Sequence, residues 1–207
     1  MIIRDALYEK YRRLADSVNS HELVRTSKLK AIKLHYHEIV ELIGNGYLEK
    51  IRHGYYRLIK ASEDEPSEAQ TIGALYPDGV VCMHTALFYF GYSERTPLAW
   101  DIAIDRNTSK ARFHIDYPFV KPYFMSASHL AYGVIEADYD GCKLKIFDRD
   151  RLVCECIRNE NKIDKETYNA AIRAYVNDPK KSISNLIEHA RKRGIQNKVK
   201  DRIGVWL

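Results

Sequence analysis

The sequence predicts an α+β protein built from two modules, and three observations lead to this class. Apolar residues recur at steps of three and four up to residue 43, which indicates helices, and two short strand-like runs follow before residue 60. Residues 61–68 are acidic and, apart from Pro66, hold nothing apolar larger than alanine, so they read as a linker. From residue 69 onwards, strand-like runs give way to a block of helices.

The opening segment predicts a helix, because its apolar residues form one stripe at helical spacing. The stripe consists of Ile3, Leu7, Tyr11, Leu14, Ala15 and Val18. Asn19-Ser20 supplies a stop for this helix. A short second helix follows, with Thr26-Ser27 as hydroxyl caps and a body that runs to Ala31.

A third helix is predicted from about His35 to Ile43. The residues expected on its buried side share the spacing i, i+3, i+4 and i+7, and they are Tyr36, Ile39, Val40 and Ile43. The residues then expected on its exposed side are His35, His37, Glu38 and Glu41. Gly44-Asn45-Gly46 ends the helix with residues that tolerate a left-handed backbone.

Two strand-like runs, residues 47–52 and 55–59, flank His53-Gly54 and predict a β-hairpin. Three helices and a hairpin within residues 1–60 is the order of a winged helix-turn-helix. In that fold a helix enters the major groove of DNA, and the hairpin lies along the neighbouring backbone or minor groove. Small helical modules with a hairpin also serve as protein-interaction domains, so that alternative stays open.

The charge is concentrated at the two ends of the chain. Residues 1–60 carry 12 Lys and Arg against 7 Asp and Glu, and residues 161–207 carry 11 against 5, while the whole chain has a net charge of +5. Basic surfaces favour a phosphate polymer or an acidic partner. Six bases near the carboxyl end mark a possible second basic surface: Arg191, Lys192, Arg193, Lys198, Lys200 and Arg202.

The candidate DNA-binding residues fall into three groups. Those expected to contact phosphates at the start of the second helix are Arg25, Thr26, Ser27 and Lys28. Those around the hairpin turn are Arg52, His53, Tyr55 and Arg57, and those expected to read base edges are His35, His37 and Asn45. At least one of Tyr55 and Tyr56 is expected to pack inside the module instead. Glu38 and Glu41 on the reading face count against this assignment.

The second module predicts a mixed sheet covered by the carboxyl-terminal helices. Strand-like runs fall at residues 80–82, 98–104, 119–125, 132–137 and 142–147, and the last two are joined by the turn Asp138–Gly141. Helices are expected at residues 67–75, 84–90, 151–158, 165–175, 182–193 and 197–206. The predicted organisation is a winged helix-turn-helix at 1–60, a linker at 61–68 and an α+β effector domain at 69–207.

The sequence offers little support for catalysis. It contains no GxxxxGK[ST], GxGxxG, HExxH or GxSxG motif, so no cofactor, no metal and no enzymatic activity are expected. Carboxylates and lysines near strand ends support a weaker alternative, a metal-dependent nuclease: Asp101, Asp116, Glu136, Asp138, Asp148, Asp150, Lys143 and Lys145. Asp148 and Asp150 are better explained as charges that favour the start of the following helix.

The cysteines and the beginning of the chain point to the cytoplasm. Cys82, Cys142, Cys154 and Cys156 form no CxxC pair, so we expect reduced thiols that pack as small hydrophobic groups. Charged residues interrupt the opening segment, and no run of about 18 apolar residues exists, so neither a signal peptide nor a membrane span is expected.

The chain resembles the AbiEi family of antitoxins, which are transcriptional regulators of bacterial abortive-infection systems. In the first module the resemblance rests on Arg25–Leu29 and on Gly46–Leu58, which is similar to the wing motif of that family. In the second module it rests on Val81–Leu87 with Gly91, on Asp140-Gly141 followed by Ile146–Leu152, and on the helices around Tyr175 and Ala190-Arg191.

The resemblance implies a winged helix-turn-helix that binds double-stranded operator DNA and represses its own operon. It also implies a second domain that counters a nucleotidyltransferase-type toxin. A ligand-sensing transcriptional regulator is a further alternative, although no motif indicates a pocket for a small molecule.

Overall fold

The structure is a computed structural model that describes residues 4–19, 22–59 and 66–204. Its contacts divide the chain into two compact units, residues 1–77 with 114–118 and residues 78–113 with 119–207. Most of the predicted linker, residues 61–65, lies outside the described residues. The division by contacts falls after residue 77, later in the chain than the expected domain start at residue 69.

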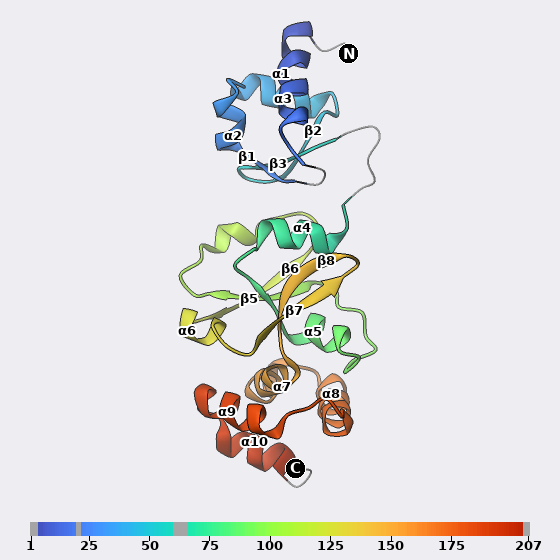
Figure 1. Ribbon diagram of the computed structural model, residues 1–207, viewed down its shortest axis with the longest axis vertical. Helices are drawn as coiled ribbons and strands as arrows, with labels where there is room; N and C mark the ends of the chain where they lie inside the picture. Colours follow the sequence, from blue (N-terminus) through green and yellow to red (C-terminus); the bar gives the residue numbers. More distant parts are fainter. Residues whose placement is uncertain (1–3, 20–21, 60–65, 205–207) are drawn as a thin grey trace. The chain divides into compact units, whose positions relative to one another are not determined.

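The first unit begins with the three helices and the hairpin that the sequence predicts (Figure 1). The elements are α1 (Asp5–Asp16), β1 (Val24–Arg25), α2 (Thr26–Ala31), α3 (Tyr36–Gly44), β2 (Leu48–Arg52) and β3 (Tyr55–Leu58). The three strands form an antiparallel sheet in the order β1-β3-β2. The sequence pattern does not predict β1, because two residues are too few to show an alternation.

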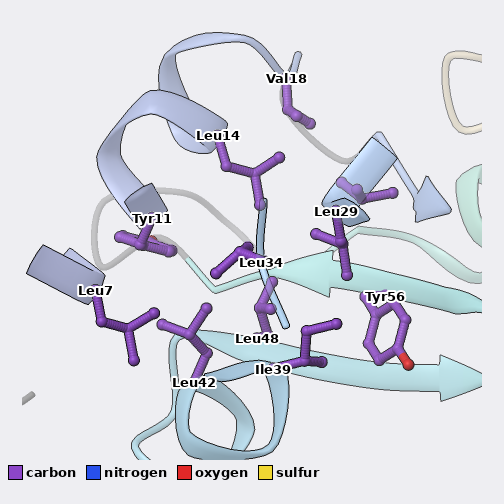
Figure 2. Close-up of a cluster of buried hydrophobic side chains, with 11 residues drawn as sticks. Leu7, Tyr11, Leu14, Val18, Leu29, Leu34, Ile39, Leu42, Leu48 and Tyr56 are labelled. Carbon is purple, nitrogen blue, oxygen red and sulfur yellow. The ribbon is translucent and has the colours of Figure 1, made fainter. Parts of the chain in front are cut away.

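Figure 2 shows the core of these elements, where the apolar stripe of α1 meets side chains from α2, α3 and the hairpin. Leu14, Leu29 and Leu42 are fully buried. Full burial of a leucine side chain contributes about 1.5–3 kcal/mol relative to leaving it exposed. The predicted stripe is confirmed for Leu7, Tyr11, Leu14 and Val18, whereas Ala15 is half-buried and Ile3 lies outside the described residues.

The buried face of α3 differs in part from the predicted one. Ile39 is buried and Ile43 is half-buried as predicted, but Tyr36 is 79% exposed and Val40 is 49% exposed, and Leu42 is buried instead. Glu38, expected on the exposed side, is also buried, because its carboxylate accepts hydrogen bonds of 2.7 and 3.0 Å from Lys10 Nζ on α1. The apolar residues of this segment cover a wide arc of the helix, so their spacing alone does not fix which part of that arc is buried.

The start of α3 agrees with the predicted start at about His35 to within one residue. His35 precedes the helix as its N-cap residue, and its backbone N–H donates to Glu38 Oε2 at 2.8 Å. The four residues between α2 and α3 include Lys33, whose φ of +59° lies in the left-handed region. Leu34 from this turn is buried in the core, which fixes the path from one helix to the next.

The helix α4 (Glu68–Leu75) is grouped with the first unit. Ser67 caps it, since its Oγ accepts from the backbone N–H of Gln70 at 3.2 Å and Gln70 Oε1 accepts from the N–H of Ser67 at 2.9 Å. This reciprocal pair is a capping box, which satisfies two backbone donors that the helix cannot pair itself.

The second unit contains a five-stranded mixed sheet and most of the helices. Its strands are β4 (Val80–Val81), β5 (Trp100–Asp105), β6 (Val120–Met125), β7 (Val134–Tyr139) and β8 (Cys142–Phe147). Its helices are α5 (Met83–Tyr89), η1 (Lys110–Phe113), α6 (Ala127–Leu130), α7 (Arg149–Arg158), η2 (Glu160–Lys162), α8 (Lys165–Asn177), α9 (Ile183–Arg193) and α10 (Gln196–Ile203). Trp206, placed in the last helix by the sequence pattern, lies outside the described residues.

The strand order of this sheet is β6-β5-β4-β8-β7, so β6 and β7 form its edges. β4 runs parallel to β8, and β5 runs parallel to β6, while the other neighbours are antiparallel. The predicted hairpin between β7 and β8 is confirmed. Asp140 and Gly141 have φ values of +52° and +80°, and Asp138 Oδ1 accepts from the backbone N–H of Gly141 at 2.7 Å.

The central helix of the second unit is α7, which packs against α5, α8, α9 and α10. Figure 1 shows α7 to α10 gathered on one side of the five-stranded sheet. Asp148 caps α7 by accepting from the backbone N–H of Arg151 at 2.7 Å, which confirms its expected role. Asp150 is buried and accepts from Tyr175 Oη at 2.8 Å and from the backbone N–H of Ser182 at 2.9 Å.

Arg151 is completely buried, although arginine is rarely found inside proteins without partners. Its Nε donates to Glu155 Oε1 at 2.8 Å, and its Nη2 donates to the carbonyl oxygen of His129 at 2.9 Å. Its guanidinium lies 4.2 Å from the centre of the Tyr132 ring. Arg151 therefore ties α7 to the segment before β7.

The protein is thus a mixed α/β structure in which helices flank a sheet. Three of the cysteines, Cys82, Cys154 and Cys156, are buried free thiols as expected, and Cys142 is half-buried. Within the described ranges, no helix has the length and apolar character needed to cross a membrane.

Candidate nucleic-acid interface

The turn of the hairpin lies against the start of α2. The backbone N–H of Thr26 donates to the carbonyl oxygen of Gly54 at 3.0 Å, and β1 pairs with β3 so that Arg25 lies opposite Tyr55. Gly54 has a φ of +80°, a conformation that glycine adopts without strain. The structure therefore brings together two groups of predicted residues that are separated by about 25 positions, consistent with antiparallel pairing of distant strands.

Two arginines from different strands share one aromatic ring at this junction. The guanidinium of Arg52 lies 3.8 Å from the centre of the Tyr55 ring, and that of Arg25 lies 5.4 Å from it. Arg25 is exposed and has no carboxylate partner in the described part of the chain. Both distances fall within the range of a cation–π contact, so the ring of Tyr55 holds the two guanidinium groups close together.

The prediction for the hairpin tyrosines is confirmed. Tyr56 is 7% exposed and belongs to the core, whereas Tyr55 is half-buried and holds the two arginines. Ser27, in the first turn of α2, and His53, in the hairpin turn, are also exposed. We call Arg25, Ser27, Arg52, His53 and Tyr55 the hairpin cluster.

Three candidates from the sequence are engaged within the protein instead. Lys28 Nζ donates to Glu22 Oε1 at 3.1 Å and to the carbonyl oxygen of Ser17 at 3.3 Å, and this contact lowers the pKa of Glu22. Arg57 pairs with Glu49 on the neighbouring strand, with Nε 3.0 Å from Oε2. The charges of Lys28 and Arg57 are therefore compensated, which argues against their expected role as phosphate contacts.

Asn45, expected to read bases, closes the end of α3. Its Nδ2 donates to the carbonyl oxygen of Glu41 at 2.8 Å, and its backbone N–H donates to the same oxygen at 3.1 Å. The side-chain amide is thus committed to the helix carboxyl terminus, where unpaired carbonyl groups need donors.

The exposed face of α3 carries Tyr36, His37 and Val40 rather than carboxylates. Glu38 points to Lys10, and Glu41 Oε2 accepts from Arg4 Nη2 at 2.9 Å, so both acids are paired with bases of α1 or its N-cap. The hydrogen bond from Lys10 lowers the pKa of Glu38. The objection that acids occupy the reading face is removed by this geometry.

His35 and His37, both expected on the exposed side of this helix, lie close together at the start of α3. Their rings are parallel within 3°, with centres 5.9 Å apart, because His35 lies outside the helix while His37 lies in its first turn. Both side chains are exposed. The pair therefore presents two imidazole edges at the start of α3.

Three exposed lysines were missed by the sequence reasoning. Lys30 on α2, Lys33 in the turn and Lys50 on β2 have no carboxylate partner among the described residues. Lys50 is followed by the buried Ile51, and Lys30 follows the buried Leu29, so the alternation of burial is the signal that identifies them.

The predicted second basic surface is largely compensated. Arg193 is buried, with its Nη2 2.9 Å from Glu155 Oε2, and Lys192 pairs with Glu188 at 2.6 Å. Lys198 and Arg202 both pair with Glu160, at 3.1 and 2.8 Å. These two bases, Arg202 first, lower the pKa of Glu160 to about 2. Within the described part of the chain, Arg191 and Lys200 alone among the six are exposed without a carboxylate partner.

The acids and lysines of the nuclease hypothesis do not converge. Asp101 accepts from the backbone N–H and the Nδ1 of His84, both at 2.8 Å. Asp148 caps α7, and Asp150 accepts from Tyr175 and Ser182. On β7, Glu136 and Asp138 lie opposite Lys145 and Lys143 of β8, and Asp116 is exposed in a loop. No group of three or more His, Cys, Asp or Glu in the described ranges is arranged to hold a metal ion.

Comparisons with known proteins add a fold but no function. No family model matches the chain, and no curated protein matches it. The structure is similar to the crystal structure of the RV2827C protein from Mycobacterium tuberculosis, with a TM-score of 0.59 and 12% sequence identity. The match covers 93% of this chain and 75% of that chain, and at this identity the chain shares its fold with that protein and nothing further is implied.

Proposed function

We propose that the first sixty residues form a winged helix-turn-helix that binds double-stranded DNA. The order α1-β1-α2-α3-β2-β3 and the sheet order β1-β3-β2 support this proposal, since α2 and α3 are joined by a short turn and the hairpin follows them. In this proposal α3 enters the major groove, and the hairpin from β2 to β3 contacts the adjacent backbone.

The observation that carries the proposal is the hairpin cluster. Arg25 and Arg52 flank the ring of Tyr55, while Ser27 at the start of α2 and His53 in the hairpin turn are exposed. Phosphate oxygens accept from guanidinium and hydroxyl groups, and such contacts fix a protein on the duplex without reading its sequence. The cluster is therefore assigned to the DNA backbone.

The exposed face of α3 is assigned to the bases. His37 offers an imidazole N–H to the acceptor atoms of a purine edge, and Val40 offers methyl groups to a thymine methyl. Tyr36 at the first turn presents a hydroxyl and a ring to the same groove. With Glu38 and Glu41 both paired inside the unit, no carboxylate on this face opposes the approach of DNA.

The wider role follows from the resemblance to the AbiEi family. We infer that the protein is a transcriptional autoregulator and the antitoxin of a toxin–antitoxin system, with the second unit as a body that counters a nucleotidyltransferase-like toxin. It is proposed to act without a reaction of its own.

Two experiments test the proposal separately. Fluorescence anisotropy with DNA from upstream of the gene is expected to show binding that weakens steeply between low and moderate salt and that prefers this DNA over a shuffled sequence. Affinity that is independent of salt, or equal for both sequences, contradicts the DNA-binding role. For the antitoxin role, co-expression with a neighbouring nucleotidyltransferase-like gene is expected to rescue growth, and continued growth arrest argues against it.

A further inference from the structure

A cavity of about 350 Å³ lies in the second unit, between the edge strand β6 and the carboxyl-terminal half of α7. Small-molecule sites have volumes of about 300–1,000 Å³. Apolar side chains form much of the wall: Met83, Pro122, Phe124, Met125 and Phe147. The cavity is therefore large enough for a compact organic molecule and offers apolar contacts to it.

The remaining wall of this cavity is strongly basic. Lys121, Arg158, Lys162 and Arg193 line it, against the single carboxylate of Glu155. Lys121, Arg158 and Lys162 are exposed at the rim and have no carboxylate partner among the residues that the structure describes.

The other acid nearby is already occupied. Asp101 is the register partner of Lys121 on the adjacent strand, but its Oδ2 accepts two hydrogen bonds from His84, each of 2.8 Å. Asp101 is 2% exposed and does not line the cavity. The excess of positive charge at the rim therefore remains uncompensated by this carboxylate.

Buried charge at the floor adds to this excess. Glu155 Oε1 lies 2.8 Å from Arg151 Nε and its Oε2 lies 2.9 Å from Arg193 Nη2, and all three side chains are at most 3% exposed. One carboxylate thus serves two buried guanidinium groups, which leaves a positive charge in a place where charge is costly. The pKa of the neighbouring His129 is lowered, first by burial and then by Arg193 and Arg151.

The hydroxyl of Tyr123 supplies an independent sign of a ligand. Tyr123 lines the cavity, and its hydroxyl oxygen is buried and has no hydrogen-bond partner in the described structure. Burial raises the pKa of Tyr123, so the hydroxyl is protonated and is a donor. An unpaired buried donor costs free energy, which a ligand oxygen at this position would recover.

The bases alone have a simpler explanation, since Arg158 and Lys162 flank the carboxyl end of α7 and offset its dipole. That explanation does not extend to Lys121 and Tyr123, which come from β6, or to Arg193, which comes from α9. Four elements, β6, α7, η2 and α9, thus contribute donor residues to the lining of one cavity.

We propose that this cavity binds a small organic phosphate. The phosphate group contacts Lys121, Arg158 and Lys162 at the rim, the Tyr123 hydroxyl donates to one of the ligand oxygens, and the apolar wall holds the organic part. A phosphate carries up to two negative charges, which matches several unpaired cations better than a single carboxylate does. This inference does not rest on DNA binding by the first unit.

Isothermal titration calorimetry on the full-length protein tests the site, with adenosine 5′-monophosphate as the probe because it joins one phosphate to one aromatic ring. Adenosine and inorganic phosphate are the comparison ligands. The nucleotide is expected to bind saturably, and adenosine at least about tenfold more weakly, because it lacks the charge that the rim recognises. Binding of inorganic phosphate that the nucleotide displaces also supports the site.

Variants separate this site from incidental binding of anions. Tyr123→Phe is expected to weaken the nucleotide about tenfold and yet to raise the melting temperature by about 2–4 °C, because it removes an unpaired buried hydroxyl. The matched control is Tyr139→Phe, which also removes a buried hydroxyl without a partner in the described residues, but outside the cavity. It is expected to leave the affinity unchanged.

Lys162→Glu on the exposed rim provides the second variant, and it is expected to weaken the nucleotide at least about tenfold without loss of folding. The proposal is overturned if neither adenosine 5′-monophosphate nor inorganic phosphate binds at a ligand concentration of about 10 mM. A Kd above this concentration would be too weak for specific recognition. It is equally overturned if the affinity survives both Tyr123→Phe and Lys162→Glu.

Discussion

Replacement of the two arginines of the hairpin cluster is the most informative perturbation of the proposed interface. In the variant Arg25→Gln/Arg52→Gln both guanidinium groups around Tyr55 are lost. Arg25 is exposed and Arg52 is half-buried beside the ring, so the core of the unit is not opened. We expect weaker binding to every DNA sequence by a similar factor, since phosphate contacts carry little base information.

The magnitude follows from the release of counterions. Each phosphate contact adds about 0.9 to the slope of log K against log salt, so the loss of two contacts lowers the slope by about 1.8. Between 50 and 200 mM salt this corresponds to a change of about 12-fold in the ratio of the two affinities. The wild-type protein should therefore lose about 12-fold more affinity over this range than the variant.

The assay is fluorescence anisotropy of a labelled duplex at several salt concentrations. The matched control is Glu49→Gln/Arg57→Gln, which removes another guanidinium of the same hairpin together with its partner and leaves the net charge unchanged. This control is expected to keep the wild-type slope. If the control lowers the slope and Arg25→Gln/Arg52→Gln does not, the assignment of the cluster to the DNA backbone is wrong.

Three further predictions concern stability and are checked by urea denaturation. Leu42→Ala should destabilise the protein by about 2–5 kcal/mol, while Val40→Ala should change stability by less than about 0.5 kcal/mol. The reverse order would mean that Val40 is buried, as the sequence pattern predicts, and Leu42 is not. Glu38→Gln should lower the free energy of unfolding by about 0.5–1 kcal/mol, because it removes the ion pair with Lys10. In the wild type this contribution is present above the ordinary glutamate pKa of 4.5 and is lost as the pH falls through the lowered pKa of Glu38. A variant whose stability has the same acid sensitivity as the wild type would refute the Lys10 pairing. Gly133 has a φ of +64°, and a Cβ added there would lie 2.8 Å from Arg151 Cβ. Gly133→Ala should therefore lower the free energy of unfolding by more than the roughly 1 kcal/mol expected for Gly141→Ala, where a Cβ meets open space. Equal losses of stability would contradict the close packing of Arg151.

The sequence predicts the order of elements in the first unit well, because helical spacing and the glycines of the turns are local signals. It does not predict the rotation of α3, since that depends on Lys10, which is 28 positions away from its partner Glu38. The contact satisfies a carboxylate that hydropathy alone assigns to solvent. Two residues of β1 are likewise visible only through their pairing with β3.

The candidate site divides in the same way. Arg25, Ser27, Arg52, His53 and Tyr55 were identified from residue type and local position, and the structure places the guanidinium groups of Arg25 and Arg52 around the ring of Tyr55. Lys28, Arg57 and Arg193 were also expected to contact a partner, but each has a carboxylate that the spacing does not reveal: Glu22, Glu49 and Glu155. A count of basic residues in the sequence includes paired and unpaired bases alike. Only the folded structure shows which of them have a carboxylate partner.

The central claim is that the start of α2, the exposed face of α3 and the hairpin turn together contact DNA. The direct measurement is the change in backbone amide chemical shifts when the labelled full-length protein is titrated with a duplex from upstream of its gene. We expect the largest changes at Ser27, His37 and Gly54, with small changes on α9 and α10. Changes confined to the second unit, or none at a DNA concentration that saturates the protein, would contradict the account.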